Sequence, residues 1–228
     1  MFKKMNDRHR KDYKIQKYIN KLQRASLDAH HETMEDAADR KFIREYVKSC
    51  IPYVCDQPEI LEFDGGVVYA DEIIRQKGGN VEFATEKGRL ERNNPITYEF
   101  DLNHEIIEKK FDLIIATQIL GGFINPVEIL KKLCSMLKRD GIIIITVSGP
   151  AYPRVKGQIT FYSKEGLVKI GRSVVGASNV KNVRSYGDFA SAICMLNYLR
   201  GSIGFDQKDY FDYKHEVINA IICVNRRN

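Results

Sequence analysis

Two apolar runs constrain the fold of this chain more than any other feature of its sequence. Phe111–Thr117 (FDLIIAT) and Ile142–Val147 (IIIITV) lack the polar–apolar alternation of a strand with one solvated face. Uninterrupted apolar strands are typical of a parallel sheet that helices cover on both faces. Since a membrane span needs about 20 apolar residues, runs this short predict a buried sheet and no membrane span.

Strand patterns and helix patterns alternate around these runs. The expected strands are Glu59–Phe63, Val81–Thr85, Ile96–Leu102, Phe111–Thr117 and Ile142–Val147. Helices are expected at Val68–Gln76 and from Asn125, which can cap a helix that has Pro126 in its first turn. Arg139–Gly141 is expected to form a turn before the fifth strand. The alternation predicts βαβ units with right-handed crossovers.

The end of the chain departs from this alternation. Ser163–Gly171 indicates a short capped helix, and Asn179–Tyr186 and Val217–Asn225 indicate two further strands, joined through a helix at Phe189–Leu199. The long link allows the last strand to insert antiparallel to its neighbours. The predicted fold is α/β: a Rossmann-like, doubly wound, mostly parallel sheet of seven strands with an antiparallel last strand, plus an N-terminal helical appendage.

The positive charge of the chain is concentrated at its N-terminus. The whole chain carries a formal net charge of +6, but residues 1–24 alone hold nine Lys or Arg against two Asp, so the remainder is nearly neutral. Apolar residues at helical spacing predict a basic amphipathic helix there and a second helix at Phe42–Cys50, which Pro52 ends. We therefore expect a helical segment over 1–50, which can dock on a partner or a second copy, and a domain over 51–228.

The near-neutral domain disfavours a nucleic-acid enzyme, which would spread positive charge over a whole face. The five cysteines are scattered and odd in number, with no CxxC spacing. This usage indicates reduced thiols in a cytoplasmic protein, not a disulfide framework or a metal site.

Ligands of an open α/β sheet bind at the carboxyl ends of its strands. Glu62 lies near the end of the first expected strand and precedes a turn with two glycines, while Glu86 and Asp101 lie at the ends of the second and third. A carboxylate after the second strand can bind both hydroxyls of a ribose, and Asp101 can accept from the exocyclic amine of a purine. The sequence has no GxGxxG motif in this region, which disfavours a nicotinamide enzyme.

The block Phe111–Val147 resembles the region around the fourth and fifth strands of class I S-adenosylmethionine-dependent methyltransferases. The shared features are an FD-aliphatic strand, a helix entered by Asn-Pro and an LK turn into an aliphatic strand. ILEFDGG falls at the first-strand glycine motif of this family, and Ser163–Leu167 and the two closing strands also match, so the resemblance covers about residues 50–226. Within the family, the Ser-Tyr-Gly segment is most similar to small methyltransferases of glycan and polysaccharide synthesis.

The resemblance implies S-adenosylmethionine as the cofactor, S-adenosylhomocysteine as its product, and no metal. It also implies which residues at the strand ends face each part of the cofactor: Glu62, Asp64, Gly65 and Gly66 the amino-acid part, Glu86 the ribose, Asp101 and Leu102 the adenine, and Thr117 and Gln118 the sulfonium and the acceptor. The residues alone leave plainer roles open. Glu62 can cap backbone amides near the first helix, and the glycines can simply relieve strain in a turn.

Aromatic and basic side chains follow the fifth and sixth strands, where the acceptor would enter. They are Tyr152, Arg154, Tyr162 and Tyr186. Aromatic faces beside an arginine suit a sugar or a sugar phosphate, although tyrosines serve equally well in packing. No residue of the sequence is identified as a catalytic base.

The resemblance thus implies an enzyme, an O-methyltransferase acting on a small polar acceptor, with a sugar hydroxyl of a glycan or nucleotide sugar as the expected substrate. Two alternatives stay open. A catalytically silent binding or assembly protein is favoured by Asp64 in place of the first family glycine. An RNA methyltransferase is favoured only by the basic N-terminus, since no proline or aromatic residue follows Thr117 in the way that base-methylating enzymes require.

Overall fold

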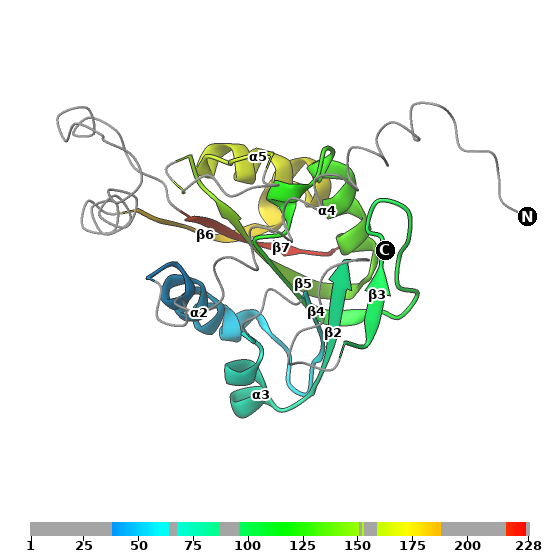
Figure 1. The fold of residues 1–228 in the computed structure, drawn as a ribbon. Coiled ribbons are helices and arrows are strands. Elements are labelled where there is room, and N and C mark those ends of the chain that lie inside the picture. The colour runs from blue at the N-terminus through cyan, green and yellow to red at the C-terminus, as the bar shows by residue number, and fades with distance from the viewer. Residues whose placement is uncertain are drawn as a thin grey trace, which may run out of the picture.

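A computed structural model describes residues 38–63, 68–86, 96–150, 152, 159–187 and 218–226 of the chain. One seven-stranded sheet with the strand order β3-β2-β1-β4-β5-β7-β6 runs through the molecule (Figure 1). Its strands are β1 Glu59–Phe63, β2 Asn80–Glu86, β3 Tyr98–Phe100, β4 Phe111–Thr117, β5 Leu137–Ser148, β6 Val180–Tyr186 and β7 Ile218–Val224. The first five strands are parallel, and β7 is antiparallel to both β5 and β6. The predicted fold class is confirmed.

Helices cover both faces of this sheet (Figure 1). On one side lie α2 (Ala38–Cys50) and α3 (Asp71–Lys77), and on the other α4 (Pro126–Ser135) and α5 (Lys164–Val175). None of the described helices is long and apolar enough to cross a bilayer. The short helical turns are η1 Ile51–Tyr53, η2 Leu120–Gly122 and η3 Ala177–Asn179.

The apolar runs of the sequence supply both layers of the core. In β5, Ile142 and Ile144 belong to the cluster beneath α2 and α3, while Ile143 and Ile145 belong to the cluster beneath α4 and α5. All four side chains are almost completely buried. Because successive residues of a strand point to opposite faces, only a strand covered on both sides needs such an unbroken run.

Helix α2 is anchored to the far edge of the sheet. The hydroxyl of Tyr46 donates to the carbonyl of Asn182 (2.7 Å), the Asn182 amide donates to Ser49 Oγ (3.1 Å), and the ring of Phe42 stacks on Tyr186 with 5.1 Å between centroids. These contacts join residues 38–50 to the core of the sheet, whereas the division of the chain at residue 50 stays a prediction. The basic helix expected within residues 1–24 and the helix expected at Phe189–Leu199 lie outside the described residues.

Several predicted boundaries differ from the structure, and at three of them a hydrogen bond explains the difference. The third strand ends at Phe100 instead of Leu102, since Asp101 begins a turn. Helix α3 begins at Asp71 instead of Val68, since the preceding amides donate to a carboxylate. The turn expected at Arg139–Gly141 lies inside β5, where Asp140 has a φ of +61° and its amide donates to the carbonyl of Asn225 (2.7 Å).

At the amino ends of β1 and β2, one lysine holds two carboxylates. Lys109 Nζ lies 2.7 Å from both Glu59 Oε2 and Glu82 Oε1, and 5.5 Å from the centroid of the Phe111 ring. Hydrogen bonding to Lys109 lowers the pKa of Glu59; burial raises that of Glu82, but the contact with Lys109 outweighs it and the pKa is lowered. The two carboxylates in turn raise the pKa of Lys109. The lowered carboxyl pKa values contribute stability above the ordinary glutamate pKa, and this contribution is lost as the pH falls through the lowered values.

We expect Lys109→Met to lower the free energy of unfolding at pH 7 by about 1 kcal/mol, because Glu59 and Glu82 then repel each other in a half-buried setting that solvent partly screens. The loss should fade below about pH 4, where both carboxyls become protonated. Urea denaturation between pH 3 and pH 7 measures it. Lys131→Met, which removes the exposed pair with Glu128, is the control. A loss that is the same at every pH would contradict the electrostatic account.

Candidate functional site

The carboxyl ends of the parallel strands gather five of the residues expected at the site. Glu62 lies next to the last residue of β1, Glu86 is the last residue of β2, and Asp101 follows β3. Thr117 is the last residue of β4, and Gln118 follows it. Since the strand order places β1 between β2 and β4, these positions form one row along a single edge of the sheet. Of Glu86 the structure describes the backbone only, and Asp64, Gly65, Gly66 and Arg154 lie outside the described residues.

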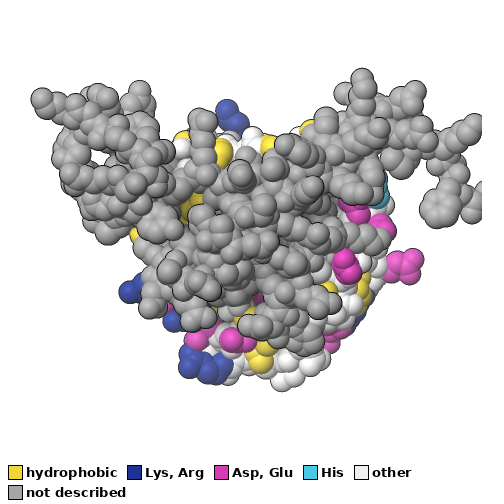
Figure 2. All heavy atoms as spheres, in the orientation of Figure 1, with side chains coloured by type: hydrophobic (Ala, Val, Ile, Leu, Met, Phe, Trp, Pro, Cys, Tyr) yellow, Lys and Arg dark blue, Asp and Glu magenta, His cyan; other side chains and the backbone are white. Residues whose placement is uncertain are grey.

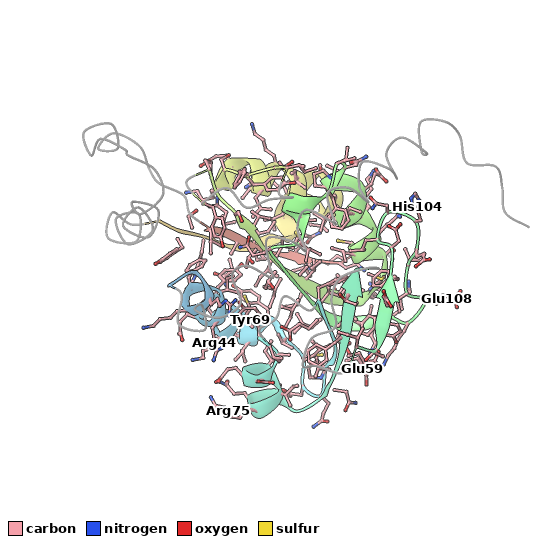
Figure 3. All side chains as sticks on the ribbon, viewed as in Figure 1. Arg44, Glu59, Tyr69, Arg75, His104 and Glu108 are labelled. Carbon is pink, nitrogen blue, oxygen red and sulfur yellow. The ribbon has the colours of Figure 1, made fainter. Side chains whose placement is uncertain are left out.

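Glu62 is the most deeply buried carboxylate in this row, with 1% of its surface exposed. Its Oε1 accepts from the amide of Tyr69 (2.8 Å) and its Oε2 from the amide of Ala70 (3.0 Å). Tyr69, which is labelled in Figure 3, and Ala70 lead directly into α3. The carboxylate therefore fixes the segment between β1 and α3 and satisfies amides that the helix leaves without acceptors. This is the capping role that the sequence left open.

Asp101 organises the turn after β3. Its Oδ1 accepts from the amide of Asn103 (2.9 Å), and its carbonyl accepts from the amides of His104 and Glu105 (2.9 and 2.7 Å). The amide of Leu102 has no acceptor among the described residues, and Lys132 on α4 binds the Leu102 carbonyl (2.9 Å). The turn thus leaves the N–H of Leu102 and a carboxylate oxygen of Asp101 available to a ligand. Lys132 of α4 holds the backbone of the turn in place.

Thr117 is buried at the end of β4, opposite Thr146 of β5. The next residue, Gln118, has a φ of +57°, a conformation that residues other than glycine seldom adopt. Its amide donates to the carbonyl of Thr146 (2.8 Å), and its Oε1 accepts from the hydroxyl of Ser148 (2.7 Å). The chain therefore leaves the sheet sharply after β4, with the side chain of Gln118 tied to the end of β5.

The loop that follows Gln118 is held by the segment after β5. The amides of Ile159 and Thr160 both donate to the carbonyl of Gly121 (2.9 and 3.2 Å), and the hydroxyl of Tyr162 donates to the carbonyl of Leu120 (3.2 Å). Burial raises the pKa of Tyr162 to about 12, so this hydroxyl keeps its proton over the whole neutral range. Tyr162 therefore holds the backbone of the loop after β4 through this hydrogen bond.

The structure does not bring the predicted acceptor residues into one cluster. Tyr162 packs in the core layer of α4 and α5, whereas Tyr152 and Tyr186 pack in the layer of α2 and α3. The ring of Tyr186 stacks on Phe42 of α2. The sheet thus separates Tyr162 from the other two tyrosines, and their joint contact with an acceptor stays a prediction.

Two residues of this edge were not expected from the sequence. Thr146 and Ser148 lie at the end of β5, where both are buried. The rule that located the other residues, that ligands lie at the carboxyl ends of strands, also applies to Ser148 because it ends its strand. Thr146 stands within an aliphatic run and gives no signal in a single sequence.

Acidic side chains gather on the surface around β3. Figure 2 shows Asp and Glu side chains gathered along the edge of the molecule on which β3 lies, and Figure 3 places His104 and Glu108 there. The only ion-pair contact of Asp101 among the described residues is a long one of 3.9 Å to His104. An acidic edge repels the phosphate backbone of nucleic acids, which agrees with the charge distribution of the sequence.

Comparisons with known proteins give similar folds but no close relative. No protein-family model matches the chain, and no curated protein matches it. Burkholderia thailandensis 1,6-didemethyltoxoflavin-N1-methyltransferase, solved with 1,6-didemethyltoxoflavin and S-adenosylhomocysteine, matches with a TM-score of 0.62 and 10% identity over 93% of this chain and 89% of its own.

Two further solved methyltransferases match in the same way. The plantazolicin methyltransferase BpumL, in complex with a monoazolic desmethylPZN analogue and S-adenosylhomocysteine, has a TM-score of 0.54 and 12% identity over 94% of this chain and 99% of its own. Haemonchus contortus phosphoethanolamine N-methyltransferase 2, in complex with S-adenosyl-L-methionine, has a TM-score of 0.58 and 12% identity over 90% of this chain and 60% of its own. The sheet order, its antiparallel last strand and these likenesses show that the chain has the Rossmann-like fold of S-adenosylmethionine-dependent methyltransferases.

Proposed function

We propose that the chain is an S-adenosylmethionine-dependent methyltransferase whose cofactor lies along the carboxyl ends of β3, β2, β1 and β4. The observation that carries this proposal is the turn after β3, where an unpaired Leu102 N–H stands next to the carboxylate of Asp101. Adenine offers one acceptor, N1, beside one donor, its exocyclic amine. The two groups of the turn are complementary to that pair, and the turn is already held by Lys132.

The other residues of the edge fit the remaining parts of this cofactor. Glu62 fixes the entry into α3 through the amides of Tyr69 and Ala70, beside the proposed amino-acid subsite. The resemblance assigns Asp64, Gly65 and Gly66 to the same subsite. Glu86 ends the strand between those two subsites, where the ribose would lie. When bound, the cofactor supplies an activated methyl group on a sulfonium, so the task of the protein is to hold donor and acceptor in line.

The proposed acceptor is a small polar molecule. The sequence predicts O-methylation of a sugar hydroxyl, with Tyr152, Arg154, Tyr162 and Tyr186 as its contacts, and this stays a prediction. Two of the similar solved proteins are named as N-methyltransferases, so a nitrogen acceptor is the alternative to the predicted hydroxyl. A small polar acceptor remains the proposed class.

Calorimetry with S-adenosylhomocysteine tests the cofactor site. We expect micromolar binding by the wild-type protein and about tenfold weaker binding by Asp101→Asn. The asparagine keeps an oxygen for the amide of Asn103, so the turn persists, but it replaces an acceptor by a donor where the adenine amine would lie. Glu128→Gln, an exposed substitution on α4, should leave the affinity unchanged.

Two results would count against the proposal. Equal affinities of wild type and Asp101→Asn would remove adenine from the turn after β3. No binding by the wild type at about 1 mM ligand, which corresponds to less than about 4 kcal/mol of binding free energy, would leave the catalytically silent binding protein as the better account.

A further inference from the structure

Hydrogen bonds account for the backbone of the turn after β3 except at one group. The amide of Asp101 donates to Glu105 Oε2 (2.9 Å), and the amide of Asn103 donates to Asp101 Oδ1 (2.9 Å). The carbonyls of Asp101, Leu102 and Asn103 all accept hydrogen bonds. Within the part of the chain that the structure describes, the N–H of Leu102 is the one group of residues 101–103 without a partner. Because buried backbone N–H groups nearly always have an acceptor, this one points to a ligand that supplies a lone pair.

Leu102 is held through its side chain as well as through its backbone. The side chain packs in the core layer beneath α4 and α5, and 1% of the residue is exposed. The peptide unit that carries the Leu102 N–H also carries the carbonyl of Asp101, which accepts from the amides of His104 and Glu105 (2.9 and 2.7 Å). Since a peptide unit is planar, these two hydrogen bonds fix the direction of the N–H at its other end. They also polarise the peptide unit, which strengthens the N–H as a donor.

Lys132 fixes the following peptide unit of the turn. Its Nζ donates to the carbonyl of Leu102 (2.9 Å) and to the carbonyl of Asn103. Lys132 is half-buried and lies on α4, 30 residues further along the chain than Leu102. Hydrogen bonds from a charged donor are roughly twice as strong as those between neutral groups. The ammonium therefore ties the turn firmly to a helix whose apolar side chains are part of the core.

The direction of this N–H decides which bases the turn can accept. In the proposed function, on which this inference rests, the adenine of the cofactor lies against the turn after β3. Adenine has a lone pair on N1 beside a donor amine, which suits the Leu102 N–H and the Asp101 carboxylate. Hypoxanthine has an N–H at N1 beside an oxygen, so it would set donor against donor and acceptor against acceptor. The turn discriminates between the two bases only while it is held in place, because a mobile turn can rotate to relieve the mismatch.

We propose that Lys132 is a positioning residue for base recognition: by holding the carbonyls of Leu102 and Asn103, it aims the Leu102 N–H at N1 of a 6-aminopurine nucleoside. Lys132 acts through the backbone that it holds and not through a contact of its own with the base. Asp101 then selects the exocyclic amine, and Lys132 makes the neighbouring N–H selective for a lone pair at N1. Without the ammonium, the N–H would take a wider range of directions and bind N1 less well.

A double-mutant cycle with modified ligands tests this role before any methyl acceptor is identified. The ligands are S-adenosylhomocysteine and its 1-deaza and 3-deaza analogues, in which a C–H replaces N1 or N3 of the adenine. Lys132→Met keeps the aliphatic stem and removes the ammonium. We expect this variant to bind S-adenosylhomocysteine and the 3-deaza analogue about tenfold more weakly than wild type. Its affinity for the 1-deaza analogue, which has no lone pair at this position, should fall by less than about twofold. Calorimetry measures each affinity.

Two further variants separate positioning from folding. Lys132→Arg keeps a cation with several donors, so it should restore the affinity for S-adenosylhomocysteine to within about threefold of wild type. Lys131→Met is the matched control, because Lys131 is the adjacent lysine of α4 and is exposed, with its Nζ 2.7 Å from Glu128 Oε1. It should leave the affinities for all three ligands unchanged. A general weakening of the fold would affect the 1-deaza and 3-deaza analogues alike, so the difference between these two ligands reports positioning alone.

Three results would overturn the role of Lys132 and leave the proposed function standing. Equal weakening of the 1-deaza and 3-deaza analogues by Lys132→Met would show that Lys132 supports the site as a whole. Unchanged affinities for all three ligands would show that the turn keeps its geometry without the ammonium. Equal affinities of the wild type for S-adenosylhomocysteine and its 1-deaza analogue would remove N1 from the Leu102 N–H. No binding of S-adenosylhomocysteine by the wild type at about 1 mM is a different result, which overturns the proposed function and this inference with it.

Discussion

Gly79→Ala is expected to lower the free energy of unfolding by about 3 kcal/mol. Gly79 lies just before β2 with a φ of +99°, which residues other than glycine seldom adopt. A methyl group there would lie 2.3 Å from the carbonyl oxygen of Pro58 and 2.8 Å from its nitrogen. Pro58 cannot give way freely, because that same carbonyl accepts from the amide of Asn80 (3.0 Å) at the start of the β2 pairing.

The neighbouring glycine provides the matched control for this prediction. Gly78 has a φ of +71°, and the atom nearest to an added methyl is Gln57 Nε2 at 2.7 Å, the end of a flexible side chain. Gly78→Ala should therefore cost only the backbone strain of its φ of +71° and ψ of −155°, about 2 kcal/mol. Urea denaturation of both variants gives the difference. Similar losses for the two would show that backbone conformation, and not the contact with Pro58, decides the effect at Gly79.

The sheet could be predicted from the sequence because its strands carry their own signal. Phe111–Thr117 is apolar throughout and is observed as β4 with the same bounds. Asn125 caps α4 with its side-chain oxygen, as its place before Pro126 predicts. The same kind of argument failed at Asp101 and Asp140, where a single hydrogen bond decides whether a residue ends a strand or continues it.

The candidate site was predictable only as far as topology determines it. Knowing that the strands are parallel places Glu62, Asp101 and Gln118 at one edge of the sheet, because each follows or ends a strand. Their partners were not predictable. The contact between Gln118 and Ser148 joins residues 30 positions apart, and local periodicity carries no information on which of two polar atoms meets which partner. The face on which Tyr162 packs depends on the loop after β5 in the same way.

Glu62→Gln is expected to lower the free energy of unfolding by about 3 kcal/mol, without any ligand present. Both carboxylate oxygens of Glu62 accept backbone amides, and the residue is 1% exposed. A glutamine keeps the size of the side chain but has one acceptor oxygen, so its NH2 group must face the amide of Tyr69 or of Ala70. One buried amide then loses its acceptor, and two donors are forced together in a site that water does not reach.

The control variant Glu45→Gln separates this cause from a general effect of losing one negative charge. Glu45 lies on α2 with 60% of its side chain exposed, and its ion pair among the described residues is with Lys48 in the following turn. Its substitution should change the free energy of unfolding by less than about 0.5 kcal/mol. Chemical denaturation of both variants makes the comparison. Because the lost amide contact lies between β1 and α3, hydrogen exchange in Glu62→Gln should accelerate first at Tyr69 and Ala70. Unaltered exchange at these two amides would show that the Glu62 carboxylate does not hold the segment that the proposed cofactor site depends on.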